Sequence, residues 1–331
     1  METRPKSIRD RAPELSAIII TPDCYATIAR SVACLGAQSV AEKLEVVIVA
    51  PSADQLGTHD LELQPFHSYQ VVEVGEIASV GEANAAGVRR ARAPVVALVE
   101  EHSYPQPGWA EALIEAHRQP WGSVGPVVGN ANGDSLVAWA DFLIAYGPWM
   151  DAYRGGIRDL LPGHNSSYKR ALLLDYGPDL QAMLESEVAL HLELRTKGHQ
   201  LYLEPAARIT HLNFERLPVW TRAQYHAGRA FAAARSERWS LPRRLLYAGA
   251  GPLIPLVRLS RILGQLRGLG RPPLPFPAVL PALLYGLAIS AVGEIAGYAL
   301  GAGVSVERLR DLEFHRARHL KAQRQPSKPE S

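Results

Sequence analysis

Glu100, Glu101 and His102 are three potential metal ligands that directly follow an apolar run, residues 95–99. The run is mostly β-branched and lacks polar alternation, which predicts a parallel strand buried on both faces. Ligands of open α/β sheets bind beyond the carboxyl ends of such strands. On an extended segment residues i and i+2 point to the same side, so Glu100 and His102 can reach one divalent ion while Glu101 faces away. A solvated acidic turn is the alternative, since two ligands make only half of a metal site.

A second group of titratable residues opens a predicted helix that ends near Gly198. Glu185 and Glu187 lie in its opening turn, and Glu187 precedes His191 by one helical turn, a spacing at which the two side chains can interact. The alternative is that both carboxylates only favour the positive end of the helix dipole. The apolar stripe predicted for this helix consists of Leu184, Val188, Leu192 and Leu194.

Two further polar positions lie where loops are expected. Residues 163–167, Gly-His-Asn-Ser-Ser, form a polar loop that is poor in the long charged side chains of ordinary surface, although a plain surface connection is the alternative. His211 ends a predicted strand.

Strands and helices alternate along the first part of the chain. Strands are predicted at residues 15–20, 44–50, 69–74 and 95–99, and helices at 26–38 and 81–92. This βαβ pattern predicts parallel strands that deliver four loops to one edge of a sheet. Further helices are predicted at residues 110–118 and 136–146, and further strands at 123–130, at 200–203 and before His211.

Composition limits the class of protein. The chain has 331 residues, 47% hydrophobic and 21% charged, which is normal for a globular protein with one large core or two smaller ones. The formal net charge of +2 gives no argument for a nucleic-acid partner. Two cysteines, Cys24 and Cys34, indicate no disulfide framework and fit a reducing cytoplasm. The charged first residues lack the apolar core of a secretory signal.

The C-terminal part contains a candidate membrane segment. Residues 274–306 include about twenty uncharged residues before Glu294, enough to cross a bilayer. Arginines flank the segment on both sides, so the charge pattern favours a re-entrant or in-plane helical hairpin as much as a single span. Glu294 is expected to pair with an arginine or to face the protein. The apolar piece within residues 245–263 is too short and interrupted to span.

Taken in order, these motifs resemble the inverting family 2 glycosyltransferases, which have the GT-A nucleotide-sugar-binding fold. The resemblance runs from about Leu15 to beyond Trp239 and includes the turn at residues 20–23, Gln38 and the Pro-x-Pro-Gly-Trp turn at 105–109. The Gly-Glu-x-x-Gly-Tyr sequence around Glu294 resembles that of membrane-associated bacterial members.

The resemblance implies roles for individual residues. When this chain is aligned with the family on Arg195 and Gly198, Glu187 matches the family's catalytic base. Glu185 is the second choice for the base. Glu100 and His102 replace the two aspartates of the family's metal motif, and His211 matches a metal or diphosphate contact, so that these three would hold Mg²⁺ or Mn²⁺.

Donor binding is the weakest part of the resemblance. The family's second strand ends in two aspartates, and this chain has Ala50 and Pro51 there, so the usual carboxylate for the nucleobase is missing. A basic helix after Trp220 lies near the donor diphosphate and the membrane in related enzymes, although a solvated helix is the alternative. The residues expected at the donor are Thr21, Asp23, Ser52, Asp54, Asn84, Glu101, Asn165 and Arg229.

The sequence therefore predicts an α/β protein with a GT-A-like, Rossmann-type, mostly parallel sheet flanked by helices. The expected parts are a polar lead (1–14), the transferase domain (15–240), a membrane-associated helical region (241–306) and a charged tail (307–331). The expected function is transfer of a sugar from a nucleoside diphosphate to a lipid-linked or envelope-glycan acceptor, with inversion, at the cytoplasmic face of the cell membrane. The alternative is a catalytically silent binding or assembly subunit, which Ala50 and Pro51 favour.

Overall fold

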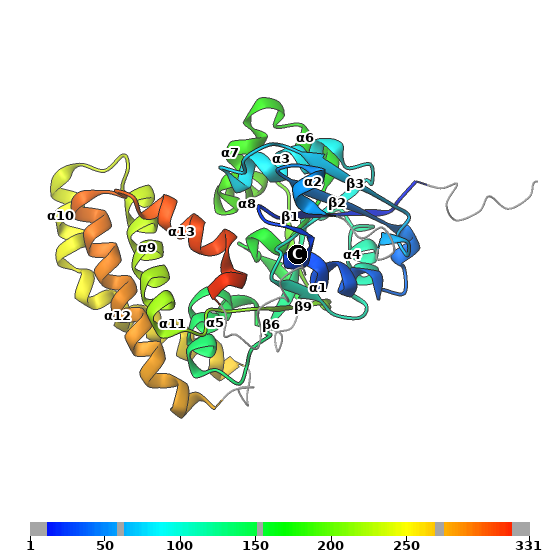
Figure 1. Ribbon diagram of the computed structural model, residues 1–331. Helices are drawn as coiled ribbons and strands as arrows, with labels where there is room; N and C mark the ends of the chain where they lie inside the picture. Colours follow the sequence, from blue (N-terminus) through cyan, green and yellow to red (C-terminus); the bar gives the residue numbers. More distant parts are fainter. Residues whose placement is uncertain (1–11, 58–62, 151–154, 269–274, 320–331) are drawn as a thin grey trace, which may run out of the picture. The chain divides into compact units, whose positions relative to one another are not determined.

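The computed structural model describes residues 12–57, 63–150, 155–268 and 275–319 (Figure 1). The chain divides into two compact units, the first formed by residues up to 129 together with 149–211, and the second by residues 130–148 and 212–325. Most of the predicted polar lead and the tail beyond residue 319 lie outside the described residues.

The first unit is built on a mixed β-sheet, and its parallel half follows the predicted alternation of strands and helices. Strands β1 (Leu15–Ile20), β2 (Leu44–Ala50), β3 (Ser68–Glu73) and β4 (Val95–Val99) stand in the order β3-β2-β1-β4 and pair in parallel. Strands β2 and β4 are buried throughout, as continuous apolar runs require. Because β2, β1 and β4 are neighbours, the residues that follow them meet at one edge of the sheet.

The other half of the sheet is antiparallel. Beyond β4 follow β8 (Ser167–Lys169), β6 (Ser123–Asn130), β9 (Leu201–His211) and β5 (Ser103–Pro105), and β7 (Gly156–Arg158) also pairs with β9. The two strands predicted between residues 200 and 211 are one strand, β9. It is continuous because its first residues pair with β7 and its last residues pair with β5, so both ends have backbone partners.

Helices flank this sheet, as the sequence predicts. They are α1 (Tyr25–Gly36), α2 (Ala53–Leu56), α3 (Val80–Arg90), α4 (Trp109–Ala116), α6 (Arg170–Leu174), α7 (Leu180–Glu185) and α8 (Glu187–Thr196). Helix α3 packs closely on the parallel strands, since a Cβ atom at Gly87 would lie 2.6 Å from Cγ2 of Ile18. The prediction of an α/β sheet covered by helices is confirmed.

The predicted single helix before Gly198 is wrong in two respects. Ser186 has non-helical backbone angles and separates α7 from α8, so Glu185 ends one helix and Glu187 begins the next. The predicted apolar stripe is also displaced, because Val188 and Leu192 are 55% and 50% exposed while Leu190 is buried. Because Ser186 interrupts the helix, the helical periodicity that the sequence predicts across this position does not hold for α8.

The second unit is helical. It contains α5 (Leu136–Tyr146), α9 (Leu217–Arg235), α10 (Leu241–Gly249), the short helix η7 (Gly251–Leu253), α11 (Ile254–Gly268), α12 (Phe276–Leu300) and α13 (Ser305–Phe314). Among the described residues, α12 alone is long and apolar enough to cross a membrane.

Helices α9 and α12 run side by side in the second unit (Figure 1). Their backbones approach closely at glycines: a Cβ atom at Gly293 would lie 2.2 Å from the carbonyl oxygen of Tyr225, and one at Gly297 would lie 2.4 Å from that of Arg229. Both helices therefore run in the same direction and pack without intervening side chains at these positions.

Candidate active site and metal centre

Three of the loops predicted to carry the site follow neighbouring parallel strands. Thr21 follows β1, Ser52 follows β2 after Pro51, and Glu100 follows β4. The register of the strands places these loops at the same edge of the sheet. The parallel half of the sheet thus brings the loops that carry Thr21, Ser52 and Glu100 to one edge.

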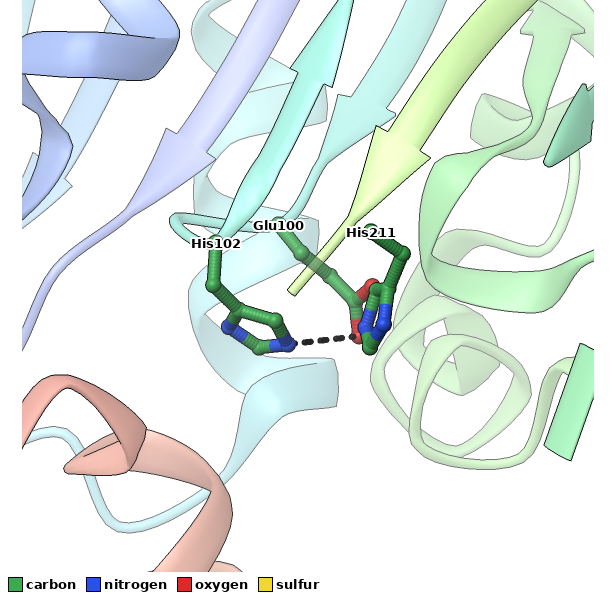
Figure 2. Close-up of side chains that lie close together, drawn as sticks. All are labelled: Glu100, His102 and His211. Carbon is green, nitrogen blue, oxygen red and sulfur yellow. Dashed lines mark ion pairs between the residues drawn. The ribbon is translucent and has the colours of Figure 1, made fainter. Parts of the chain in front are cut away.

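Glu100, His102 and His211 form a compact group at this edge. Nε2 of His211 lies 3.4 Å from Oε2 of Glu100, and Nε2 of His102 lies 3.9 Å from Oε1 of Glu100. The two imidazole rings meet edge to face, with centroids 4.7 Å apart. Figure 2 shows both rings and the carboxylate turned toward one another. One ligand atom from each residue lies within 4.8 Å of the others.

Local backbone pairing explains why these residues meet. The amide of Ser103 donates to the carbonyl of Glu100, which closes a turn between β4 and β5. Ser103 then pairs across the sheet with His211, the last residue of β9. The sequence predicts that Glu100 and His102 converge because they are residues i and i+2 of an extended segment. In the structure a turn brings them together instead. Helix α1 holds the turn through the Ser31 hydroxyl, which donates to the carbonyls of Glu101 and Ser103 at 2.8 and 2.9 Å.

The charge of Glu100 is fixed by its surroundings. Burial alone would raise the pKa of this carboxyl, but His102 and His211 beside it hold the pKa well below its usual range. The Asn165 side-chain amide donates to Oε2 of Glu100 at 2.5 Å, and the Ser103 hydroxyl donates to the same oxygen at 3.3 Å. Glu100 is therefore an ionised and oriented carboxylate at neutral pH.

The donor set of this group fits a divalent metal ion. Two imidazoles and one carboxylate are a common ligand set for transition metals and leave further coordination positions for water or substrate oxygens. Imidazole nitrogen is a poorer ligand for Mg²⁺, which prefers oxygen.

Glu187 lies at the start of α8 and is buried. Its Oε1 atom is 2.6 Å from Nδ1 of His164, a residue of the short helix η5 (Gly163–Asn165). Burial raises the pKa of the Glu187 carboxyl, and the charge of His164 acts in the opposite direction. A buried carboxyl with a raised pKa is suited to accept a proton from a substrate.

The sequence predicts His191 as the partner of Glu187, and this prediction is wrong. Nε2 of His191 is 3.0 Å from the hydroxyl of Tyr168 instead. The break before α8 makes Glu187 its first residue, from which the carboxylate reaches the loop at residue 164. His164 lies in the polar loop that the sequence singles out, but no pattern in the sequence connects it with Glu187.

Glu185, the fallback base, is engaged elsewhere. Its Oε2 atom accepts hydrogen bonds from the Ser79 hydroxyl at 2.5 Å and from the Gly81 amide at 2.8 Å. Both donors belong to the N-terminal end of α3. Glu185 thus satisfies backbone groups at a helix start and links α7 to α3.

The loop at residues 163–165 joins the two chemical groups of the site. His164 contacts Glu187, and Asn165 holds Glu100. Gly163 makes room for this arrangement, because a Cβ atom there would lie 2.2 Å from Oε2 of Glu187. The candidate base and the candidate metal ligand are therefore positioned by adjacent residues.

The residues expected at the donor occupy varied positions. Thr21 is buried and its hydroxyl contacts that of Thr27 at 2.8 Å, while Asp23 donates its amide to the Thr21 hydroxyl. Ser52 caps α2 by accepting from the Gln55 amide, and Asp54 is exposed on the same helix. The remaining three in the first unit, Asn84, Glu101 and Asn165, are all buried.

Arg229, the last residue expected at the donor, belongs to α9 in the second unit. Its Nε atom donates to the carbonyl of Gly301 at 2.9 Å, and its guanidinium lies against Gly303. In the structure Arg229 therefore binds the segment that follows α12.

Gln38, which the resemblance includes, has a clear structural task. Its side-chain amide donates to the carbonyl of Gln106, and its side-chain oxygen accepts from the Ala110 amide. It thereby fastens α1 to the turn that begins α4. Gly108 in that turn has a φ of 85°, a conformation that favours glycine.

No protein-family model matches the chain, and no curated protein matches it in sequence. Among solved structures, the chain is similar to GalNAc-T7 with UDP, GalNAc and Mn²⁺ (TM-score 0.46, 12% identity, 61% of this chain and 43% of that chain). It is also similar to the mannosyltransferase PcManGT from Pyrobaculum calidifontis in complex with GDP-Man and Mn²⁺ (0.44, 17%, 95% and 83%). A third similar structure is S. aureus TarS 1–349 (0.44, 14%, 89% and 91%). At this degree of similarity, the function must be argued from the site itself.

Proposed function

We propose that this protein is a glycosyltransferase that moves a sugar from a nucleoside diphosphate donor to an acceptor hydroxyl with inversion. The observation that carries the proposal is the loop at residues 163–165, which holds a buried carboxyl suited to act as a base next to a three-ligand metal group. A base and a cation at one sheet edge are what direct displacement of a diphosphate by a hydroxyl requires.

In this mechanism the acceptor hydroxyl lies within hydrogen-bond distance of Glu187. Glu187 accepts its proton as the oxygen attacks the anomeric carbon from the side opposite the diphosphate, which inverts the configuration. His164 holds the carboxylate in place and favours its ionised form. Glu100, His102 and His211 would hold the metal ion, which would offset negative charge on the departing diphosphate.

We further propose that the acceptor is lipid-linked or part of an envelope glycan, and that the protein acts at the cytoplasmic face of the cell membrane. One helix of the second unit, α12, meets the length and hydropathy of a membrane segment. The helical region from about residue 241 would bring the transferase domain to its acceptor.

A catalytically silent binding subunit is the second candidate. Ala50 at the end of β2 is fully buried and apolar, so it offers no carboxylate to a nucleobase. Ser52 and Asp54 follow it, and the Ser52 hydroxyl is occupied as a helix cap. This candidate predicts nucleotide binding without turnover, or no binding.

Thermal unfolding with UDP or GDP, each with Mn²⁺, Mg²⁺ or chelator, tests the proposal. A ligand that binds the native state at 100 times its Kd stabilises it by about 2.7 kcal/mol. We expect a metal-dependent rise in Tm, larger with Mn²⁺, that is lost in Glu100→Ala and His102→Ala. His199→Ala, a histidine outside this group, is the matched control and should retain the rise. If the nucleotides raise the Tm equally in all variants, with and without metal, the proposed metal centre is rejected.

A further inference from the structure

Helix α10 turns its apolar residues outward. Leu241, Leu245 and Leu246 are 60%, 53% and 69% exposed. Arg244 points inward instead, where its Nε atom donates to the carbonyl of Tyr298 on α12 at 2.8 Å. A helix on the surface of a water-soluble domain has the opposite arrangement, with its apolar stripe toward the core. The exposed side of α10 is therefore suited to an apolar medium.

Exposed apolar residues continue in the chain that follows α10. Leu253 in η7 and Leu256 and Val257 in the first turn of α11 are 58%, 63% and 47% exposed. We call these residues together the outward leucine face. It consists of Leu241, Leu245, Leu246, Leu253, Leu256 and Val257.

The charge of this part of the chain indicates what covers the face. Residues 238–293 contain seven arginines and no aspartate or glutamate. Arg243, Arg261 and Arg267 are exposed. A protein partner needs no such one-sided charge, whereas phosphate groups of an anionic lipid surface attract it.

A partly exposed tryptophan, Trp239, lies directly before α10 and supports a lipid surface. The Trp239 ring is stacked with that of Tyr298 at 5.9 Å between centroids, and the Arg243 guanidinium lies 4.1 Å from the centre of the Trp239 ring. Tyr298 is itself buried, but a partly exposed tryptophan beside an exposed arginine is typical of the boundary between lipid head groups and acyl chains.

The packing of α12 decides between the two membrane arrangements left open by the sequence. With 25 residues, α12 is about 37 Å long and could cross a bilayer by length. However, it contacts α9 from Gly286, which lies against Trp220, to Gly297, which lies against Arg229. Helix α9 also carries Arg222, which is exposed. If α12 crossed the membrane in this packing, charged residues of α9 would enter the hydrocarbon, which is strongly unfavourable.

We infer that the second unit lies in the plane of an anionic membrane surface, with the outward leucine face among the acyl chains and the arginines at the head groups. Helix α12, which is only partly buried, is then a helix that α9, α5 and α11 pack against and that does not cross the membrane. Glu294 fits this role, since it is buried and lies 3.5 Å from Nη1 of Arg258 on α11. The inference rests on the membrane attachment proposed above and specifies how it is made.

Flotation of the purified full chain with preformed vesicles tests whether the outward leucine face binds a lipid surface. Wild-type protein should float with phosphatidylcholine vesicles that contain phosphatidylglycerol and much less with phosphatidylcholine alone. Leu245→Gln/Leu246→Gln should lower the partition coefficient by at least about tenfold, because each leucine side chain loses its apolar burial. Ile157→Gln/Leu192→Gln, at comparably exposed apolar positions of the first unit, is the matched control and should float like wild type.

Protease treatment of sealed membrane vesicles from cells that express the full chain tests the position of α12. Epitopes at the N-terminus and at the C-terminus should be cleaved from the same side. Cleavage of only one epitope without detergent would show that α12 crosses the membrane and would overturn the inference.

The remaining outcomes separate this inference from the proposed attachment. If the wild-type chain neither floats nor sediments with membranes, the attachment itself fails, and the face belongs to a protein partner or a second copy. If wild type floats and Leu245→Gln/Leu246→Gln floats equally well, attachment stands but the outward leucine face is not its cause. Sugar transfer to a soluble acceptor is measured independently of both.

Discussion

Glu187 and Glu185 are separated by one residue, but their surroundings give them different tasks. Glu187 is buried against His164, whereas Glu185 accepts hydrogen bonds at the start of α3. Glu187→Gln removes the proton acceptor and should lower turnover by about 10²–10⁴-fold while donor binding survives. Glu185→Gln retains an acceptor oxygen for Ser79 and Gly81, so its turnover should stay within a few-fold of wild type. Turnover and donor affinity of both variants are the measurements, and the reverse order would make Glu185 the base.

His164 is expected to set the pH at which the base works. Burial raises the pKa of Glu187 and His164 counteracts this, so His164→Leu should raise the pKa further. A base must be deprotonated to act, and the acidic limb of the kcat/KM profile should therefore move to higher pH in this variant. His164→Asn keeps a hydrogen-bond donor but no charge and should show a smaller displacement. If the acidic limb of the kcat/KM profile lies at the same pH in His164→Leu as in wild type, the assignment of Glu187 as the titrating base is contradicted.

At the scale of elements, the contact between α9 and α12 depends on glycine. A Cβ atom at Gly293 would lie 2.2 Å from a backbone oxygen of α9, which cannot move independently of its helix. Gly293→Ala should therefore lower the free energy of unfolding by about 1–3 kcal/mol. A Cβ atom at Gly264 in α11 would meet no heavy atom within 4 Å, and Gly264→Ala should raise helix stability by up to about 1 kcal/mol. Urea unfolding of both variants measures the difference, and equal effects would contradict close helix packing.

The same packing bears on how the membrane region can be removed. Deletion from about residue 241 is expected from the sequence to leave a soluble transferase domain. In the structure such a deletion removes α12, against which α9 and α5 pack within the second unit. The apolar sides of those two helices would become exposed, so the paired glutamine substitutions at Leu245 and Leu246 are the cleaner test of membrane attachment.

At the scale of the whole molecule, two buried histidines should make stability depend on pH. Burial lowers the pKa of His117 to about 3 and that of His191 to about 4. Each is protonated in the unfolded chain below a pH of about 6.5, but the folded state resists protonation, so stability falls as the pH drops below about 6.5. Each histidine should lower the free energy of unfolding by about 2 kcal/mol between pH 7 and pH 5.

His117→Gln tests this contribution by urea unfolding at the two pH values. Whatever the substitution does to packing, the difference in stability between pH 7 and pH 5 should become smaller by about 2 kcal/mol. A pH dependence that is the same in His117→Gln as in wild type would contradict the prediction.

The sequence by itself determined many of the local elements and the edge of the sheet that carries the site. Strands β1, β2 and β6 and helix α5 have the predicted bounds, because continuous apolar runs and helical periodicity are local properties of the chain. The meeting of Glu100, His102 and His211 also follows from strand ends and from the family resemblance, and the structure brings the three together. Their role as metal ligands stays a prediction.

Tertiary structure decided the contacts between side chains that are distant in sequence. Glu187 pairs with His164, 23 positions earlier, and Glu185 binds the start of α3, about a hundred positions earlier, because folding, and no local pattern, brings these groups together. Hydropathy marks α12 as apolar, but the same composition suits a membrane span and an internal helix. The packing against α9 supports the in-plane arrangement inferred above, and only the tertiary structure shows that the apolar helix lies along one that carries charged residues.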